Sequence, residues 1–181
     1  RIQKLMPLCI TSLSGGAKDN AIPRSCQASV VAMGINLERI NDITAELEKE
    51  IRENYDEPDV KIYGDDVDAL GGNALTTSCT DKVIALLCGA PNGVQSWSKD
   101  IEGLVQTSLN LGIVELNEEL CMTFAVRSSV NQEKRELLDK LAQLSAFYDA
   151  SFSEMGDYPA WEYKKDSALR ETMISVYRKM F

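Results

Sequence analysis

The sequence of 181 residues contains no histidine, so it lacks the side chain that most often serves as a general base or a metal ligand. A cysteine nucleophile would lack its usual activating imidazole, which makes a catalytic cysteine a weak alternative. The five cysteines include no C-x-x-C pair, are widely spaced and mostly stand in apolar runs. We therefore expect buried free thiols in a reducing, cytoplasmic compartment.

Long apolar runs and basic residues are also scarce. No apolar run reaches the length of a membrane span and no signal peptide is recognisable, so we expect no role at a membrane. The 28 acidic side chains outnumber the 19 basic ones, which gives a net charge of −9. This charge would repel the phosphates of nucleic acids and anionic lipids, so small molecules or proteins remain as partners. The chain begins at Arg1 and not at Met, which is compatible with a piece cut from a longer protein.

The first part of the chain predicts a hairpin, a helix and a further strand. Apolar runs over 8–13 and 26–33, joined by the glycine-containing corner 14–24, predict two antiparallel strands. Apolar residues at helical spacing from Leu37 to Ile51 predict a helix that Asn36 caps. The short alternating segment 60–63 predicts a third strand.

The same order returns in the second half of the chain. Strands are predicted over 108–116 and 120–126, followed by a helix that Asn131 caps and a strand over 151–155. Between the halves, 80–87 predicts one helix that Gly89 and Pro91 end. The order predicts an α+β fold of two tandem ferredoxin-like strand-strand-helix-strand units, which form an extended antiparallel sheet with helices on one face.

Two other segments favour ordinary loops over binding sites. The acidic segment 65–68 before Gly71 is similar to the start of a calcium loop, but Leu70 and Thr77 occupy positions where that loop needs oxygen ligands. A solvated acidic loop is the favoured interpretation. The pairs Gly15-Gly16 and Gly71-Gly72 lack the lysine and the following helix of a phosphate-binding loop, so we interpret both as turns.

Three polar residues form the candidate binding site: Asn20 and Arg24 in the corner between the first two strands, and Arg127 at the end of the second hairpin. The alternation of the second hairpin places Arg127 on the face away from the core. A guanidinium at a strand end can bind a carboxylate through two parallel hydrogen bonds. The alternative is structural: Asn20 caps a turn, Arg24 opens a strand and Arg127 forms a surface ion pair.

Five blocks of sequence, in order and spacing, resemble the bacterial aminoacyl-histidine dipeptidases. The blocks are Gly15-Gly16 with Asn20-Ala21-Ile22-Pro23-Arg24, Ala90-Pro91-Asn92-Gly93-Val94, Val105-Gln106-Thr107-Ser108-Leu109-Asn110-Leu111-Gly112, Val126-Arg127-Ser128, and Gly156-Asp157-Tyr158-Pro159-Ala160-Trp161. The resemblance runs from about Leu8 to the C-terminus. It implies a cytosolic metallopeptidase, related to carnosinases and aminoacylases, that hydrolyses Xaa-His dipeptides such as carnosine with two zinc ions.

The zinc ligands and the general base of that family lie on a catalytic domain whose motifs are missing from this sequence. The resemblance therefore implies that the chain is the lid and dimerisation domain alone, with no catalytic residue, no metal site and no activity by itself. A first lid repeat would cover 1–65, a connection with one helix 66–107, and a second lid repeat 108–157. Residues 158–181 would return, with a helix over 166–181, to the catalytic domain that carries the zinc.

The resemblance also implies a role for each candidate residue. Asn20 would hydrogen-bond the backbone of the dipeptide, Arg127 would bind its C-terminal carboxylate, and Arg24 would hold the corner. The chain's own catalytic domain and a second copy of the chain would be its protein partners. Ala160 and Ala168 replace a glycine and a proline that are usual in the family, and both lie near the return to the catalytic domain. The alternative function is a free-standing, non-catalytic ligand-binding or dimerisation module with ferredoxin-like repeats.

Overall fold

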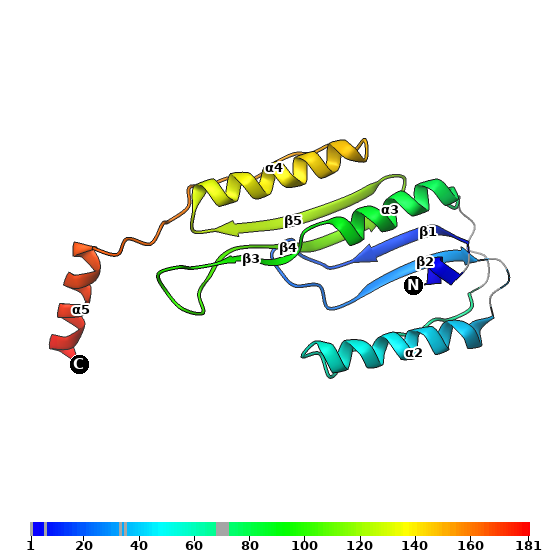
Figure 1. Ribbon diagram of the computed structural model, residues 1–181, viewed down its shortest axis with the longest axis horizontal. Coiled ribbons are helices and arrows are strands. Elements are labelled where there is room, and N and C mark those ends of the chain that lie inside the picture. The colour runs from blue at the N-terminus through cyan, green and yellow to red at the C-terminus, as the bar shows by residue number, and fades with distance from the viewer. Residues whose placement is uncertain (1, 6, 33, 35, 68–72) are drawn as a thin grey trace. The chain divides into compact units, whose positions relative to one another are not determined.

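The structure is a computed structural model that describes residues 2–5, 7–32, 34, 36–67 and 73–181 (Figure 1). The chain forms two compact units, and each collects segments that are distant in the sequence. Unit 1 contains Arg1–Ala17, Pro23–Cys88 and Ile113–Met122, and unit 2 contains Lys18–Ile22, Gly89–Gly112 and Thr123–Phe181. The predicted division at residues 65, 107 and 157 stays a prediction.

The described helices are α1 (Ile2–Leu5), α2 (Leu37–Asn54), α3 (Thr77–Gly89), α4 (Asn131–Phe147) and α5 (Ala168–Met180). The described strands are β1 (Leu8–Gly15), β2 (Cys26–Ala32), β3 (Gly93–Trp97), β4 (Val105–Leu116) and β5 (Leu120–Ser128). None of these helices combines the length and the apolar character that a membrane span requires.

The strands form an antiparallel sheet in the order β2-β1-β4-β3, and β5 pairs with β4 as well. In the first hairpin Leu8 lies opposite Ala32, and Gly15 lies opposite Cys26. Each hairpin is followed by a long helix, α2 after β2 and α4 after β5. The α+β class, the antiparallel sheet and the tandem order of hairpin and helix are therefore confirmed.

The core of unit 1 forms between β1, α3 and the end of β4. Leu8 and Ile10 of β1 are buried against Val83 of α3 and Leu116 of β4. The fully buried hydroxyl of Thr80 accepts a hydrogen bond from the Ile10 N–H at 3.2 Å. This contact satisfies a strand donor in an apolar setting, where an unpaired N–H would be costly.

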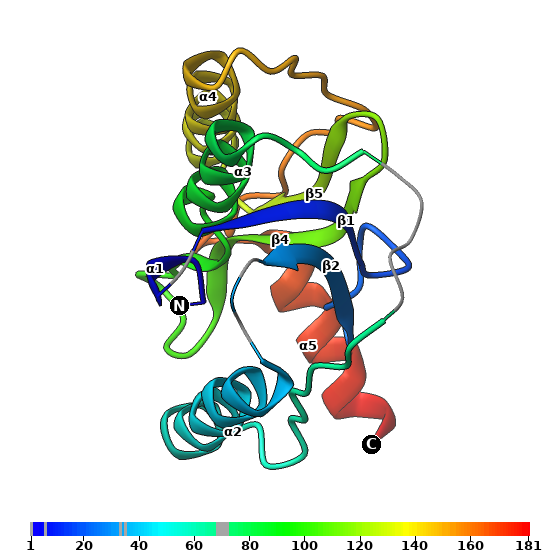
Figure 2. The ribbon, with the colours of Figure 1, turned by 90° about the vertical axis from the view of Figure 1, so that its right-hand side faces the viewer.

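The core of unit 2 lies between α4 and the hairpin of β4 and β5. Leu137 and Leu141 stand one turn apart on α4 and bury themselves against Leu109, with Phe124 and Val126 of β5 packed beside them. The two views of the ribbon show α4 running along β5 (Figures 1 and 2). This packing fixes where β5 ends, and therefore where Arg127 stands.

The predicted strand over 60–63 is wrong, because this segment runs without strand pairing beside α2. The Ile62 N–H donates to Oε2 of Glu48 at 2.8 Å, and a guanidinium nitrogen of Arg52 donates to the Val60 carbonyl at 2.8 Å. Side chains of α2 thus satisfy the backbone groups that a neighbouring strand would otherwise satisfy.

Two predictions after β5 are also wrong. Segment 151–155 is not a strand, and the Arg135 side chain holds it to α4 through Glu154 at 3.1 Å. Asn131 is not the N-cap of α4, which is Val130 without a side-chain hydrogen bond. Its side-chain oxygen Oδ1 accepts from the Ala160 N–H at 2.9 Å instead, so Asn131 secures the segment that follows α4. By contrast, Asn36 caps α2 as predicted by accepting from the Arg39 N–H.

Three further predictions have mixed outcomes. The helix predicted over 80–87 is confirmed as α3, but the strand β3 was not foreseen in the same connection. The cysteines are free thiols, yet the prediction that they are buried is wrong: Cys9 is half-buried, and Cys26, Cys79, Cys88 and Cys121 are exposed. Cys79 and Cys88 lie on α3 away from its buried positions, Thr80 and Val83. The expected acidic loop and glycine turn fall partly on 68–72, outside the described residues.

Candidate substrate-binding site

The end of β5 presents Arg127 to solvent on a fixed backbone. Arg127 is exposed, and among the described residues its guanidinium makes no hydrogen bond or ion pair. The next residue is tied down: Oγ of Ser128 accepts from the Val130 N–H at 3.0 Å and lies 2.8 Å from Oγ1 of Thr107. The structure therefore combines an anchored strand end with an available guanidinium, a group that can bind a carboxylate through two parallel hydrogen bonds.

Glu133, in the first turn of α4, is the common acceptor of a polar cluster that reaches Ser128, the residue after Arg127. Its carboxylate accepts from the Ser96 hydroxyl at 2.5 Å, from the Gln106 amide at 2.5 Å and from the Thr107 hydroxyl. Only 2% of Thr107 is exposed, so its hydroxyl depends on protein partners. Glu133 thereby joins β3, β4 and α4, and through Thr107 it also connects to Ser128 at the end of β5.

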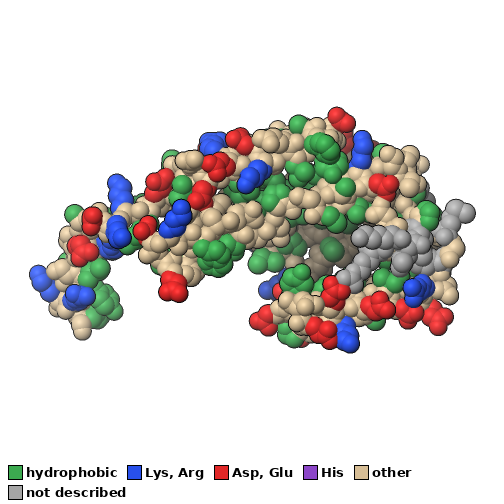
Figure 3. All heavy atoms as spheres, in the orientation of Figure 1, with side chains coloured by type: hydrophobic (Ala, Val, Ile, Leu, Met, Phe, Trp, Pro, Cys, Tyr) green, Lys and Arg blue, Asp and Glu red, His purple; other side chains and the backbone are tan. Residues whose placement is uncertain are grey.

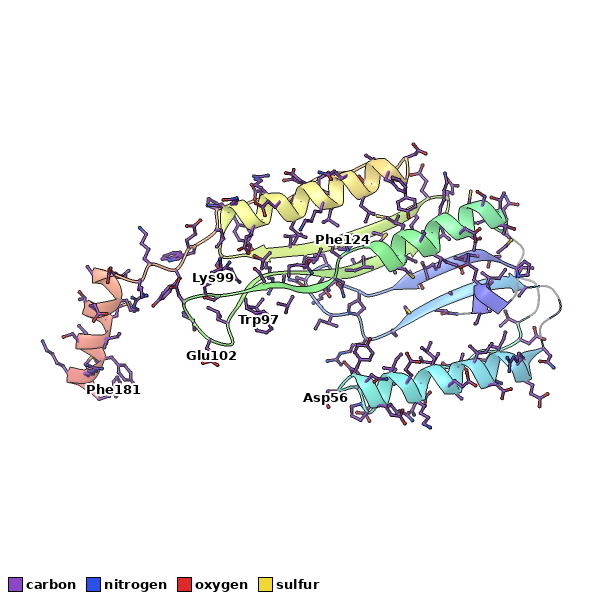
Figure 4. The ribbon with its side chains drawn as sticks, in the orientation of Figure 1. Asp56, Trp97, Lys99, Glu102, Phe124 and Phe181 are labelled. Carbon is purple, nitrogen blue, oxygen red and sulfur yellow. The ribbon has the colours of Figure 1, made fainter. Side chains whose placement is uncertain are left out.

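These contacts favour the ionised form of the Glu133 carboxyl. The hydrogen bond from Ser96 is the largest cause that lowers the pKa of Glu133, and the bond from Thr107 follows. Desolvation opposes them, while the Gln106 amide and the charge of Lys99 act in the same direction as the hydroxyls. Lys99 lies in the loop after β3 (Figure 4). The cluster is therefore held by a carboxylate that keeps its charge.

The corner 14–24 divides between the two units. Asn20 lies in the unit 2 loop Lys18–Ile22, where it is exposed and its N–H donates to Oδ1 of Asp19 at 2.8 Å. Its side-chain amide makes no hydrogen bond to any residue that the structure describes, so the alternative role as a turn cap is absent there. Arg24 belongs to unit 1, is exposed and precedes β2.

The three candidate residues are all exposed, as a substrate site requires, but no hydrogen bond or ion pair joins Asn20 to Arg127 within the described part of unit 2. Their binding roles stay predictions. Sequence reasoning missed Glu133 and Thr107 as supports of Arg127. Two signals could have found them, namely an acidic residue in the first turn of a helix and a threonine at an inward position of a strand.

A second polar cluster binds segment 154–160 to α4. Nζ of the largely buried Lys134 donates to Oδ1 of Asp157 at 2.6 Å and to the Tyr158 carbonyl at 2.5 Å. Arg135 binds the other oxygen of Asp157 at 2.7 Å. The hydrogen bond from Lys134 is the largest cause that lowers the pKa of Asp157. These contacts therefore hold the first residues of the block Gly156 to Trp161 against α4.

The described residues do not fit a zinc site, since no three side chains of the metal-binding types gather among them. A surface groove of about 610 Å³ runs along α2 in unit 1 and is lined in part by Thr44, Arg52 and Tyr63. None of the three candidate residues lines it.

The comparisons with known proteins agree with the resemblance in the sequence. No protein-family model matches the chain. The cytosol non-specific dipeptidase of Escherichia coli K12 is 27% identical over an alignment of 181 positions, which covers 97% of this chain and 37% of that protein. The crystal structure of the aminoacylhistidine dipeptidase from Vibrio alginolyticus matches 99% of the chain and 37% of its own, with a TM-score of 0.87 and 24% identity. The chain thus spans little more than a third of either relative, and its sequence and fold resemble one part of these dipeptidases.

Proposed function

We propose that this chain is the lid domain of a zinc-dependent Xaa-His dipeptidase and that it contributes substrate contacts but not the hydrolytic machinery. The observation that carries the proposal is the extent of the match: nearly the whole chain corresponds to only 37% of two dipeptidases. The remaining length of such a protein would hold the two zinc ions and the general base. The parent protein would be a cytoplasmic peptide hydrolase.

In this proposal Arg127 binds the C-terminal carboxylate of the dipeptide. A guanidinium offers two parallel N–H donors that match both carboxylate oxygens, and the anchored end of β5 limits the geometry in which they meet. The exposed Asn20 amide hydrogen-bonds the peptide backbone, and Arg24 holds the corner before β2. Such contacts fix the scissile bond in space and reduce the entropy lost in the transition state.

Helix α5 supports the idea that this chain meets a further protein surface. None of its residues is buried, although its apolar side chains recur at helical spacing. The exposed ones are Leu169, Met173, Ile174, Val176, Tyr177 and Met180, and Phe181 follows them. Figure 3 shows apolar side chains gathered on α5, and Figure 4 labels Phe181 at the end of this helix. A helix with an exposed apolar stripe favours a partner, which we propose is the catalytic domain of the same protein.

Strand β2 supports the proposed homodimer. It ends the strand order of the sheet, so one of its edges has no strand partner among the described residues. Val30 and Val31 of this strand are 40% and 54% exposed. A second copy could pair with the free amides of this edge and cover both side chains.

The test compares the 181-residue chain with the full-length protein that its gene encodes. Hydrolysis of an Xaa-His dipeptide is measured with added zinc, cobalt or manganese. We expect the full-length protein to be active and the chain alone to be inactive, since water activation needs a held metal and a base. Metal-dependent turnover by the chain alone would overturn the lid proposal. A full-length protein without dipeptidase activity would favour the free-standing binding module instead.

A further inference from the structure

The loop that carries Asn20 is short, exposed and held by few contacts of its own. Its internal hydrogen bonds run from the Ala21 N–H to the Lys18 carbonyl at 3.3 Å and from the Asn20 N–H to Asp19. Exposed polar loops of this length exchange among conformations unless another element fixes them. The Asn20 amide can therefore act at a defined place only if the loop is held from outside.

The Asn110 side chain of β4 supplies one such contact. Its amide nitrogen donates to the Ala21 carbonyl at 2.7 Å and lies 3.3 Å from the Asp19 carbonyl. These two carbonyls flank Asn20 on both sides. One amide group has two hydrogens, so Asn110 can bridge both carbonyls and fix the 19–20 and 21–22 peptide planes, which enclose Asn20 and Ala21.

Gly112, two residues further along β4, also determines where the loop lies, because the absence of a side chain leaves space for Asp19. A Cβ atom at this position would lie 2.1 Å from the Asp19 carbonyl oxygen and 2.6 Å from its Cα. Both are backbone atoms, so no side-chain rotation could relieve the overlap. Ordinary carbon contacts lie at about 3.5–4.0 Å, and a methyl group here would displace the loop by roughly 1 Å or more.

The pairing of β4 explains why the loop can lie at this place. Residues of β4 up to Leu109 pair with β3, and the pairing with β1 begins at Val114. Between them, the Leu111 N–H donates to the side-chain oxygen of Asn92 at 2.9 Å, a group outside any strand. The stretch 110–112 is thus a short gap between two strand partners, where a loop can approach the backbone of β4.

We propose that Asn110 and Gly112 are positioning residues that hold the Asn20 side chain in its substrate contact. Asn110 fixes the loop through the carbonyls on either side of Asn20, and Gly112 leaves the space in which Asp19 lies. This inference rests on the proposed function, in which Asn20 binds the backbone of a dipeptide. It assigns two residues of β4 that touch no substrate themselves.

The experiment is a double-mutant cycle in the full-length protein, with hydrolysis of an Xaa-His dipeptide as the assay. Asn110→Leu removes the donor at similar volume and is expected to lower kcat/KM about tenfold. Gly112→Ala displaces the loop and is expected to lower kcat/KM up to about 100-fold. Gly89→Ala is the matched control, because a Cβ at Gly89 meets no atom within 4 Å.

The cycle separates positioning from a merely structural role. If Asn110 and Gly112 act through Asn20, neither substitution lowers kcat/KM further in an Asn20→Ala background. Hydrogen exchange of residues 18–22 should also accelerate in both variants and stay unchanged in Gly89→Ala. Additive losses, or unchanged activity in both single variants, would overturn the inference while leaving the lid proposal intact. An Asn20→Ala variant with full activity would instead refute the substrate role of Asn20 and, with it, this inference.

Discussion

Removal of the Glu133 carboxylate should destabilise unit 2, because three donors converge on it. Hydrogen bonds to a charged group contribute about 1.5–3 kcal/mol each, so three independent bonds would sum to about 4.5–9 kcal/mol. The half-buried Ser96 and Gln106 can turn toward water when the acceptor is lost, whereas the buried Thr107 cannot. We therefore expect Glu133→Ala to lower the free energy of unfolding by about 2–3 kcal/mol at neutral pH.

The measurement is urea denaturation of the 181-residue chain followed by circular dichroism at several pH values. Since the pKa of Glu133 is lowered on folding, its contribution is present above the ordinary pKa of the unfolded carboxyl and is lost as pH falls through the folded pKa. The difference between wild type and variant should shrink accordingly in acid. Glu136→Ala is the control, because Glu136 is exposed and accepts only from Gln132 among the described residues. A loss below about 0.5 kcal/mol, or one that is constant with pH, would refute the role of Glu133.

Three other expectations follow from the same structure. In the full-length protein, Arg127→Ala should weaken transition-state binding by about 2–4 kcal/mol, and Arg127→Lys should recover only part of this lost binding energy. An unchanged kcat/KM in Arg127→Ala would remove Arg127 from the site. Asp157→Ala should speed proteolytic cleavage of segment 154–160, because Lys134 and Arg135 lose their shared partner, and unaltered cleavage would contradict the anchoring. Light scattering at micromolar concentration should give the mass of a dimer, and a monomer would reject self-association through the β2 edge.

The parts of the fold that follow from local patterns were predictable from the sequence. Both hairpins and their long helices have clear periodicity, and Asn36 caps α2 through a partner three residues away. The wrong predictions depend on distant partners. Segment 60–63 has the alternation of a strand, but Glu48 and Arg52 satisfy its backbone groups. Asn131 has the chemistry of a cap, yet its partner is Ala160, 29 positions further along.

The candidate site shows the same limit. The exposure of Arg127 follows from strand alternation, which needs only the neighbouring residues. The polar cluster around Glu133 does not follow from such a local pattern. Its members Ser96, Thr107 and Glu133 come from three separate elements and meet only in the folded unit. Strand β3 escaped prediction for the same reason, since four of its five residues are exposed and its pairing with β4 defines it.

The two cores differ in the length of chain that each must close, and this has a consequence for folding. The core of unit 2 joins residues from Leu109 to Leu141, whereas the core of unit 1 needs Leu8 and Val83 together with Leu116. Closing a longer loop costs more entropy before any contact compensates for it, so we expect unit 2 to form first. Higher φ-values at Leu137 than at Leu8 would be the kinetic sign of this order. During synthesis, the apolar side chains of the first hairpin would stay exposed until Leu116 leaves the ribosome and the core of unit 1 can form.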